Sequence, residues 1–152
     1  MPTRRGLFLL ALLPALAPAL AAAQEASALQ SPVGLWQTFD DHTGQPRGLV
    51  RIFESQGRLY GDIARVLDTD KPGAVCVKCT DDRKDKLVLG LQIIRGLVPD
   101  GNEWSGGTIL DPETGTAYRC SMHLTDGGRK LVLRGYIGIS LFGRSQTWVR
   151  VG

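Results

Sequence analysis

The stretch TAYRCSMHLT, residues 116–125, shows the clearest alternation of side chains in this sequence. Tyr118, Cys120, Met122 and Leu124 fall on one face of an extended strand, because successive side chains of a strand point to opposite sides. The polar and charged residues between them fall on the other face. One apolar face and one polar face predict a sheet that covers an apolar interior and meets water on its outer side.

Strand-like segments recur on both sides of this stretch, and turns rich in Gly, Pro and Asp join most of them. Short strands at such spacing are typical of an all-β sandwich or barrel. We predict a single antiparallel up-and-down β-barrel of about eight strands, whose interior is either filled by side chains or holds one small ligand. The predicted strands are residues 33–39, 49–54, 59–67, 87–94, 103–110, 116–125, 130–139 and 146–151, with a turn at 98–102 and a long loop at 68–86.

The first residues have the features of a secretory signal peptide. Arg4 and Arg5 give a positive start, an apolar stretch follows, and small residues up to Ala23 suit a signal peptidase. The apolar stretch is shorter than the roughly 20 residues of a spanning helix. We expect a signal peptide over residues 1–23, a flexible leader over 24–32 and the barrel domain over 33–152, in a periplasmic or secreted protein.

Composition narrows the class of protein. The 152 residues carry a formal net charge of +3, and the predicted signal peptide contributes two of the basic residues. Binding of nucleic-acid phosphates needs a clustered basic surplus, so we expect no nucleic-acid partner. No later apolar stretch is long enough to span a membrane, so no transmembrane segment is expected in the mature chain. The length fits one domain with a modest core.

Three cysteines, Cys76, Cys79 and Cys120, are disulfide candidates, and an odd number leaves one unpaired in an oxidising compartment. A redox role for Cys76 and Cys79 would favour a helix N-terminus that lowers the thiol pKa. A zinc site needs four convergent ligands, and His123 falls on the opposite strand face from Cys120. We expect a disulfide between Cys120 and either Cys76 or Cys79. It would attach the long loop to the barrel and raise the free energy of unfolding by about 3–4 kcal/mol. The sequence leaves the pairing open.

No catalytic constellation emerges from the remaining residues. Most carboxylates, such as those of Asp40 and Asp111, lie in predicted turns, where Asp bonds its own backbone. Neither Asp40-Asp41 nor Asp81-Asp82 matches a calcium loop, and no nucleophile elbow is present. We therefore expect no catalytic residue, no metal site and no cofactor, which favours a role other than catalysis.

Several motifs in combination resemble a known family. The resemblance covers essentially the whole mature chain and points to the bacterial exported family catalogued as domain of unknown function 2147. It implies a lipocalin-like β-barrel in the periplasm or at the cell exterior, and it implies no established activity. The motifs are Cys76-Val77-Lys78-Cys79, Lys84-Asp85-Lys86, Gly90-Leu91, Trp104-Ser105-Gly106-Gly107, Ile109-Leu110-Asp111-Pro112, Gly115, Tyr118, Arg134-Gly135-Tyr136-Ile137-Gly138 and Gly143-Arg144-Ser145-Gln146-Thr147-Trp148.

The first predicted strand is also similar to the Gly-x-Trp opening of lipocalins, through Gly34-Leu35-Trp36. That resemblance implies a basic residue from the last strand region lying across the Trp and closing one end of the barrel. Arg150 or Arg144 could take this role. The chain differs from lipocalins in being shorter and in lacking a recognisable C-terminal helix.

We expect a barrel that binds a small apolar or amphipathic molecule, or an envelope component, at the barrel mouth and the loop 68–86. The alternative is a filled barrel that serves as an interaction or structural module of the envelope, with its aromatic residues as core. A thiol-disulfide protein built on Cys76 and Cys79 is a third interpretation. The candidate ligand-binding residues are Trp36, Trp104, Tyr118, Tyr136 and Arg134.

Overall fold

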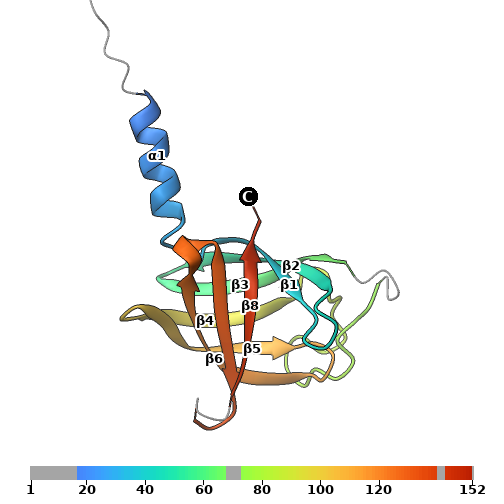
Figure 1. The fold of residues 1–152 in the computed structure, drawn as a ribbon. Coiled ribbons are helices and arrows are strands. Elements are labelled where there is room, and N and C mark those ends of the chain that lie inside the picture. Colours follow the sequence, from blue (N-terminus) through green and yellow to red (C-terminus); the bar gives the residue numbers. More distant parts are fainter. Residues whose placement is uncertain (1–16, 68–72, 140–142, 152) are drawn as a thin grey trace, which may run out of the picture.

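The computed structural model describes residues 17–67, 73–139 and 143–151. A single α-helix, α1 (Ala17–Ala28), projects away from a compact β-structure (Figure 1). No helix in these three ranges is long and apolar enough to cross a bilayer. Eight strands follow α1: β1 (Gly34–Phe39), β2 (Pro46–Ser55), β3 (Arg58–Val66), β4 (Gln92–Asp100), β5 (Glu103–Asp111), β6 (Thr116–Thr125), β7 (Lys130–Tyr136) and β8 (Arg144–Arg150).

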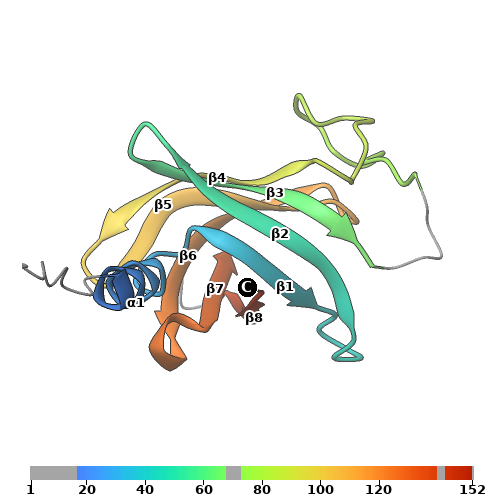
Figure 2. The ribbon, with the colours of Figure 1, turned by 90° about the horizontal axis from the view of Figure 1, so that it is seen from above.

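The strands close into one antiparallel barrel, as the alternation predicted. Each strand pairs with the next in the sequence, and β8 pairs with β1 to complete the ring (Figures 1 and 2). The β1–β8 seam is short, with Trp36 opposite Arg150 and Gln37 opposite Val149. The predicted inward face of β6 is confirmed, since Cys120 and Met122 are fully buried while Arg119 and His123 are exposed.

The prediction of a strand over residues 87–94 was wrong at its first half. β4 begins at Gln92, and Leu87 and Leu89 are exposed in the preceding loop. Leu87 forms only an isolated bridge with Val75, and residues 88–90 form a bend and a turn in which Gly90 has a φ of 85°. The alternation of leucines therefore does not belong to a strand of the barrel.

Two other boundaries also differ from the prediction. The expected turn at 98–102 is confined to Gly101 and Asn102, because β4 pairs with β5 as far as Asp100 opposite Glu103. The strand expected over 130–139 ends at Tyr136, and the following Ile137 and Ile139 are exposed.

Connections between strands alternate between two ends of the barrel. The β2–β3, β4–β5 and β6–β7 turns lie at one end, which we call the plugged end. The β1–β2, β3–β4, β5–β6 and β7–β8 connections lie at the other, which we call the open end. Residues 73–91, which precede β4, extend beyond the strands at the open end (Figure 2).

Arg150 closes the plugged end, which confirms the resemblance to the lipocalin opening for this residue. Its guanidinium carbon lies 4.3 Å from the ring centroid of Trp36. Its Nε donates to the carbonyl of Gly128, and its two Nη atoms donate to Val33 and Ser31, at 2.9, 3.0 and 2.6 Å. Burial lowers the pKa of Arg150, and these carbonyls together with the ring face compensate the charge.

The close approach of Arg150 explains why the Gly34-Leu35-Trp36 motif begins with glycine. A Cβ at this position would lie 2.6 Å from an Nη atom of Arg150, and the backbone φ is 150°. Two residues later the indole nitrogen of Trp36 donates to the carbonyl of Pro32 at 2.8 Å. Residues 31–33, which span the end of the predicted leader, are thereby bound to the barrel.

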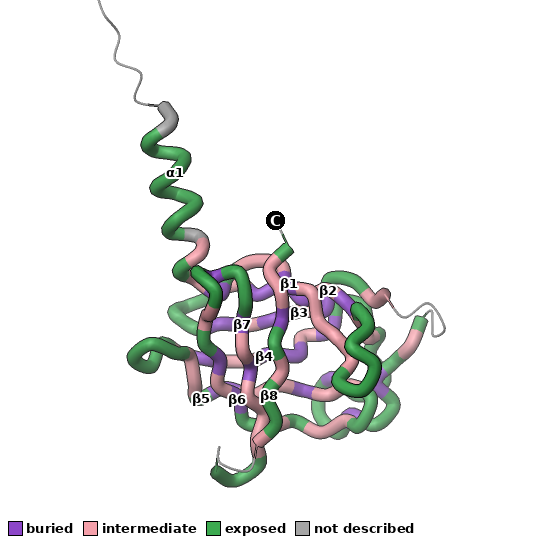
Figure 3. Tube along the Cα trace, viewed as in Figure 1, coloured by how far each residue is buried: buried purple, intermediate pink, exposed green. Residues whose placement is uncertain are grey.

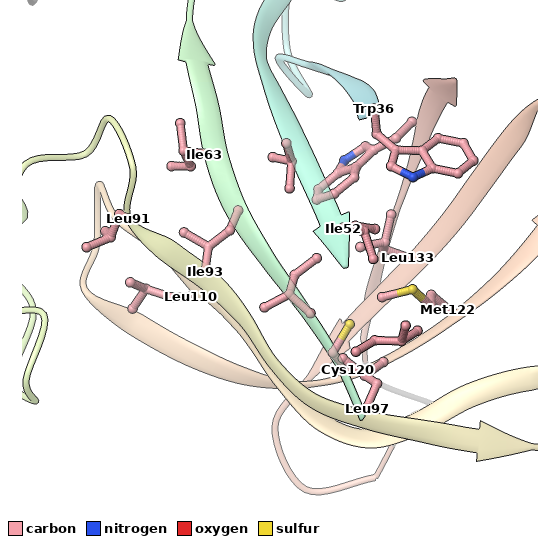
Figure 4. Packing of buried hydrophobic residues seen from close by; sticks show 14 of the residues in the cluster. Trp36, Ile52, Ile63, Leu91, Ile93, Leu97, Leu110, Cys120, Met122 and Leu133 are labelled. Carbon is pink, nitrogen blue, oxygen red and sulfur yellow. The ribbon is translucent and has the colours of Figure 1, made fainter. Parts of the chain in front are cut away.

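The interior is packed solid toward the plugged end. Buried residues lie along the strands of the barrel, whereas residues 19–27 of α1 are exposed (Figure 3). Figure 4 shows Cys120 beside Met122 and Leu97, apart from Leu91 and Leu110. Dense packing of this kind supplies most of the apolar burial that stabilises a small barrel.

We predict that Arg150→Met lowers the free energy of unfolding by about 2 kcal/mol, because three carbonyls and the Trp36 ring lose their donor. Urea unfolding followed by fluorescence measures this change. The control is Arg129→Met, an exposed neighbour, which should shift stability by less than about 0.5 kcal/mol. Equal effects of the two substitutions would contradict the role given to Arg150.

Candidate ligand-binding cavity

A cavity of about 780 Å³ occupies the open end of the barrel. Its inner wall contains side chains from five strands, namely Val50, Ile63, Ile109, Leu133 and Trp148. Residues of the β3–β4 loop, including Val75, Val77 and Val88, continue the apolar wall beyond the strands. Within the described part of the chain, the fully buried core side chains such as Trp36, Leu97 and Met122 do not line it. The barrel is thus filled at one end and hollow at the other.

A chain of polar contacts runs along one side of the mouth, beside the β1–β8 seam. The indole nitrogen of buried Trp148 donates to Gln146 Oε1 at 3.2 Å. Gln146 Nε2 donates to both carboxylate oxygens of Asp41 at 2.9 Å, and Arg144 pairs with Asp41 at 3.0 Å. These contacts tie the β1–β2 loop to the start of β8 and fix the orientation of Trp148 in the wall.

A second ion pair crosses the mouth. Arg47, at the start of β2, pairs with Glu113 in the β5–β6 turn, although β2 and β5 are not neighbours in the barrel. Burial opposes the charge of Arg47, but the Glu113 carboxylate and nearby Asp111 raise its pKa overall. Both side chains are partly exposed, so the pair contributes about 1 kcal/mol or less and can separate at low cost.

The β3–β4 loop carries the Cys76–Cys79 disulfide, whose Cα atoms lie 5.4 Å apart. Val77 and Lys78, the two residues within this four-residue ring, line the cavity. A Cβ at Gly115 would overlap the carbonyl of Lys78, so the ring packs tightly against the β5–β6 turn. The disulfide therefore fixes the shape of a ring that packs against a neighbouring hairpin at one wall of the mouth.

Two ion pairs stabilise the same loop. One lies within the loop, and the other joins the loop to β4. Arg83 is 4% exposed; its Nε and one Nη bond Asp81, while the other Nη donates to the carbonyl of Gln92 at 3.0 Å. Hydrogen bonds from Arg83 lower the pKa of Asp81 to about 2. Asp82 forms a bidentate pair with Arg95 at 2.8 and 2.9 Å. The loop is an ordered wall in its described part, 73–91.

The cavity includes some of the predicted ligand-binding residues and leaves out others. Tyr118 lines it, and Tyr136 lies at its rim, 5.9 Å from the guanidinium of Arg119. Trp36 is in the plug, and Trp104 packs against the core near the plugged end. Neither residue lines the cavity, because both lie at the plugged end.

Arg134 does not line the cavity either. It lies between inward-facing Leu133 and Gly135 on β7, and its Nη1 donates to Ser145 Oγ at 3.0 Å on the outer side of the barrel. The charges that do line the mouth are Arg47, Arg65, Lys78, Arg144, Asp41, Asp111 and Glu113. Their position next to turns at one end of an up-and-down barrel was available from the strand order. Prediction from the sequence did not identify these seven residues as a group.

The predicted disulfide between a loop cysteine and Cys120 was wrong. Cys120 faces the packed interior from the middle of β6, whereas Cys76 Sγ lies 3.4 Å from the carbonyl of Pro112 at the open end. Several strand residues separate the two places, at about 3.4 Å of rise for each residue. Cys76 and Cys79 pair locally instead, and Cys120 is a buried free thiol. Residues 68–72 of the predicted binding loop 68–86 lie outside the described residues.

Comparison with known proteins identifies the family. A family described as "Uncharacterized protein conserved in bacteria (DUF2147)" matches residues 34–150, which is the whole barrel. The chain belongs to this family. A search of curated proteins finds no match.

Among solved structures, protein HP1028 from the human pathogen Helicobacter pylori, described as belonging to the lipocalin family, resembles this DUF2147 barrel. The TM-score is 0.69 at 18% sequence identity, over 80% of this chain and 84% of that chain. At this identity the likeness concerns the fold. It agrees with the closed eight-stranded barrel and with the predicted lipocalin-like architecture.

We predict that Cys120 does not react with iodoacetamide at pH 8 in the native protein. Burial raises the pKa of this thiol to about 12, so the reactive thiolate fraction at pH 8 is on the order of one in ten thousand. After denaturation, mass spectrometry should find Cys120 alkylated and a non-reduced digest should link Cys76 to Cys79. A peptide containing Cys120 in a disulfide would contradict this assignment.

Proposed function

We propose that this protein is an exported, non-enzymatic binding protein that holds a small apolar or amphipathic molecule in the open end of its barrel. One observation carries the proposal, namely the cavity of about 780 Å³ whose inner wall consists of aliphatic and aromatic side chains. Ligand sites in proteins are typically clefts of about 300–1,000 Å³ with apolar walls and a few polar groups. The cavity of this barrel falls within that range.

The arrangement of the wall supports binding of an elongated apolar group. Strand residues such as Val50, Ile109 and Leu133 provide the deep part, and loop residues such as Val77 and Val88 extend it to the mouth. Apolar area removed from water contributes about 25 cal/mol per Å², so a ligand that fills the cavity gains affinity in proportion to its buried surface.

The two other interpretations have less support. In a filled barrel the wall residues would be packed as tightly as Trp36 and Met122 are. The wall residues instead face a cavity. A thiol-disulfide exchange role would require access to Cys76 or Cys79, which are 0% and 1% exposed. The lipocalin assignment of the Helicobacter pylori protein with a similar fold is consistent with ligand binding.

Export is part of the same proposal. We expect cleavage after Ala23, within the span of α1, so that the mature chain begins at Gln24. The variant Ala23→Phe should block cleavage, because signal peptidase requires a small residue there, whereas Ala26→Phe should be cleaved normally. Intact-mass measurement of the protein from the periplasmic fraction tests this. An uncleaved wild-type chain would contradict it.

Binding is tested with N-phenyl-1-naphthylamine, a neutral apolar dye that fluoresces in apolar sites. Ile109→Trp narrows the cavity and should weaken dye binding at least tenfold. The matched control is Thr108→Trp on the same strand, which lies opposite exposed Arg119 and faces outward. Fluorescence titration gives the dissociation constants, and far-ultraviolet dichroism checks that both variants fold.

Two results would contradict the proposal. The first is absence of saturable dye binding to the wild-type protein. The second is equal binding by Ile109→Trp and Thr108→Trp, since only the former occupies cavity space. Native mass spectrometry of protein purified under mild conditions gives an independent measurement, and it should show a bound apolar molecule.

A further inference from the structure

We propose that the cavity selects a single-chain amphiphile with an anionic head group, and that Arg65 and Lys78 bind this head group at the mouth. This inference rests on the proposed function, because it assumes that the apolar tail occupies the barrel. It specifies the chemical class of the ligand and the residues that distinguish one head group from another.

The charges at the mouth are not balanced by one another. Two of the four lining cations are neutralised, since Arg47 pairs with Glu113 and Arg144 pairs with Asp41. The remaining carboxylate, Asp111, accepts a hydrogen bond from the backbone N–H of Glu113 at 2.9 Å. Its negative charge also raises the pKa of Arg47.

Arg65 and Lys78 are the two lining cations without an ion-pair partner among the described residues. Both line the cavity and both are exposed, and within the described ranges neither has an ion-pair partner. Two unpaired cations beside an apolar cavity favour an anionic group at the entrance, where a carboxylate or phosphate can accept from a guanidinium and an ammonium.

The backbone at both residues is fixed, although the side chains are exposed. Arg65 lies on β3 opposite Leu49 of β2. Lys78 lies inside the Cys76–Cys79 ring, and its carbonyl packs against Gly115. Arg65 therefore projects from a strand and Lys78 from the disulfide ring beside the β5–β6 turn, and binding would order only the side chains themselves.

Three other basic residues in and beside the β3–β4 loop differ from these two cations, because their side chains already have partners. Arg83 is buried and committed to Asp81 and Gln92, and Lys84 Nζ donates to the carbonyl of Val77. Arg95 is committed to Asp82. Arg83 and Lys84 thus help to hold the loop, and Lys78 is the cation in the described part of the loop that lines the cavity.

The experiment compares ligands that share one tail. Dodecanoate, dodecyl phosphate, dodecanol and dodecyltrimethylammonium are titrated below their micelle concentrations, by displacement of N-phenyl-1-naphthylamine. The double variant Arg65→Gln/Lys78→Gln removes both cations. The control Arg129→Gln/Lys130→Gln makes the same change of charge on exposed residues at the plugged end.

The wild-type protein should bind dodecanoate or dodecyl phosphate about tenfold more tightly than dodecanol, because two partly exposed ion pairs contribute together about 1.4 kcal/mol. Arg65→Gln/Lys78→Gln should lose that advantage and keep its affinity for dodecanol, while the control should retain both. Added salt should weaken binding of the anions alone. Comparison of the two anions shows whether a carboxylate or a phosphate is preferred.

The inference is overturned if dodecyltrimethylammonium or dodecanol binds as tightly as the anions, or if the double variant binds dodecanoate like the wild type. Either result would leave the proposed function intact, since the tail would still bind. Failure of every ligand and of the dye would instead contradict the proposed function. The two claims are therefore separable within one set of titrations.

Discussion

Closure of the barrel depends on the seam between β1 and β8, where the ladder is short. The pairs Trp36–Arg150 and Gln37–Val149 supply little backbone pairing by themselves. At the plugged end Arg150 adds three bonds to backbone carbonyls and a cation–π contact with Trp36. At the open end Asp41 binds Arg144 and Gln146 across the same seam. Side chains thus complete a ring that the ladder alone would join weakly.

That closure also divides the interior into two parts. The plug, with Trp36 under Arg150, fixes one end, and the fully buried side chains collect behind it. At the other end four connections surround the mouth, and the longest of them adds an apolar wall instead of a filling. A small barrel can in this way keep a dense core for stability and still enclose a ligand-sized space.

The β3–β4 loop gives the cavity its polarity. Its disulfide, its buried Arg83 and its pair with Arg95 hold the backbone, so that Val77 and Lys78 occupy defined places at the entrance. A mouth built from a braced loop presents an apolar surface and an unpaired cation together. An amphiphile has the same combination of tail and head, which links the proposed function to the proposed head-group preference.

Local features of the chain were enough to predict the class of fold, the strand order and the family. Alternation over residues 116–125 and the turns between strands are local features, and Gly34 with Trp36 marks the plug. Cysteine pairing and the position of each residue along the barrel depend on the distance between remote residues, and they became clear only in the folded protein. Cys120 could not be excluded from a disulfide until β6 placed it in the core, and Trp104 could not be placed at the plugged end. Periodicity tells which side of a strand a residue occupies, but the height of each residue in the barrel depends on register and closure, which are set by contacts far apart in the chain.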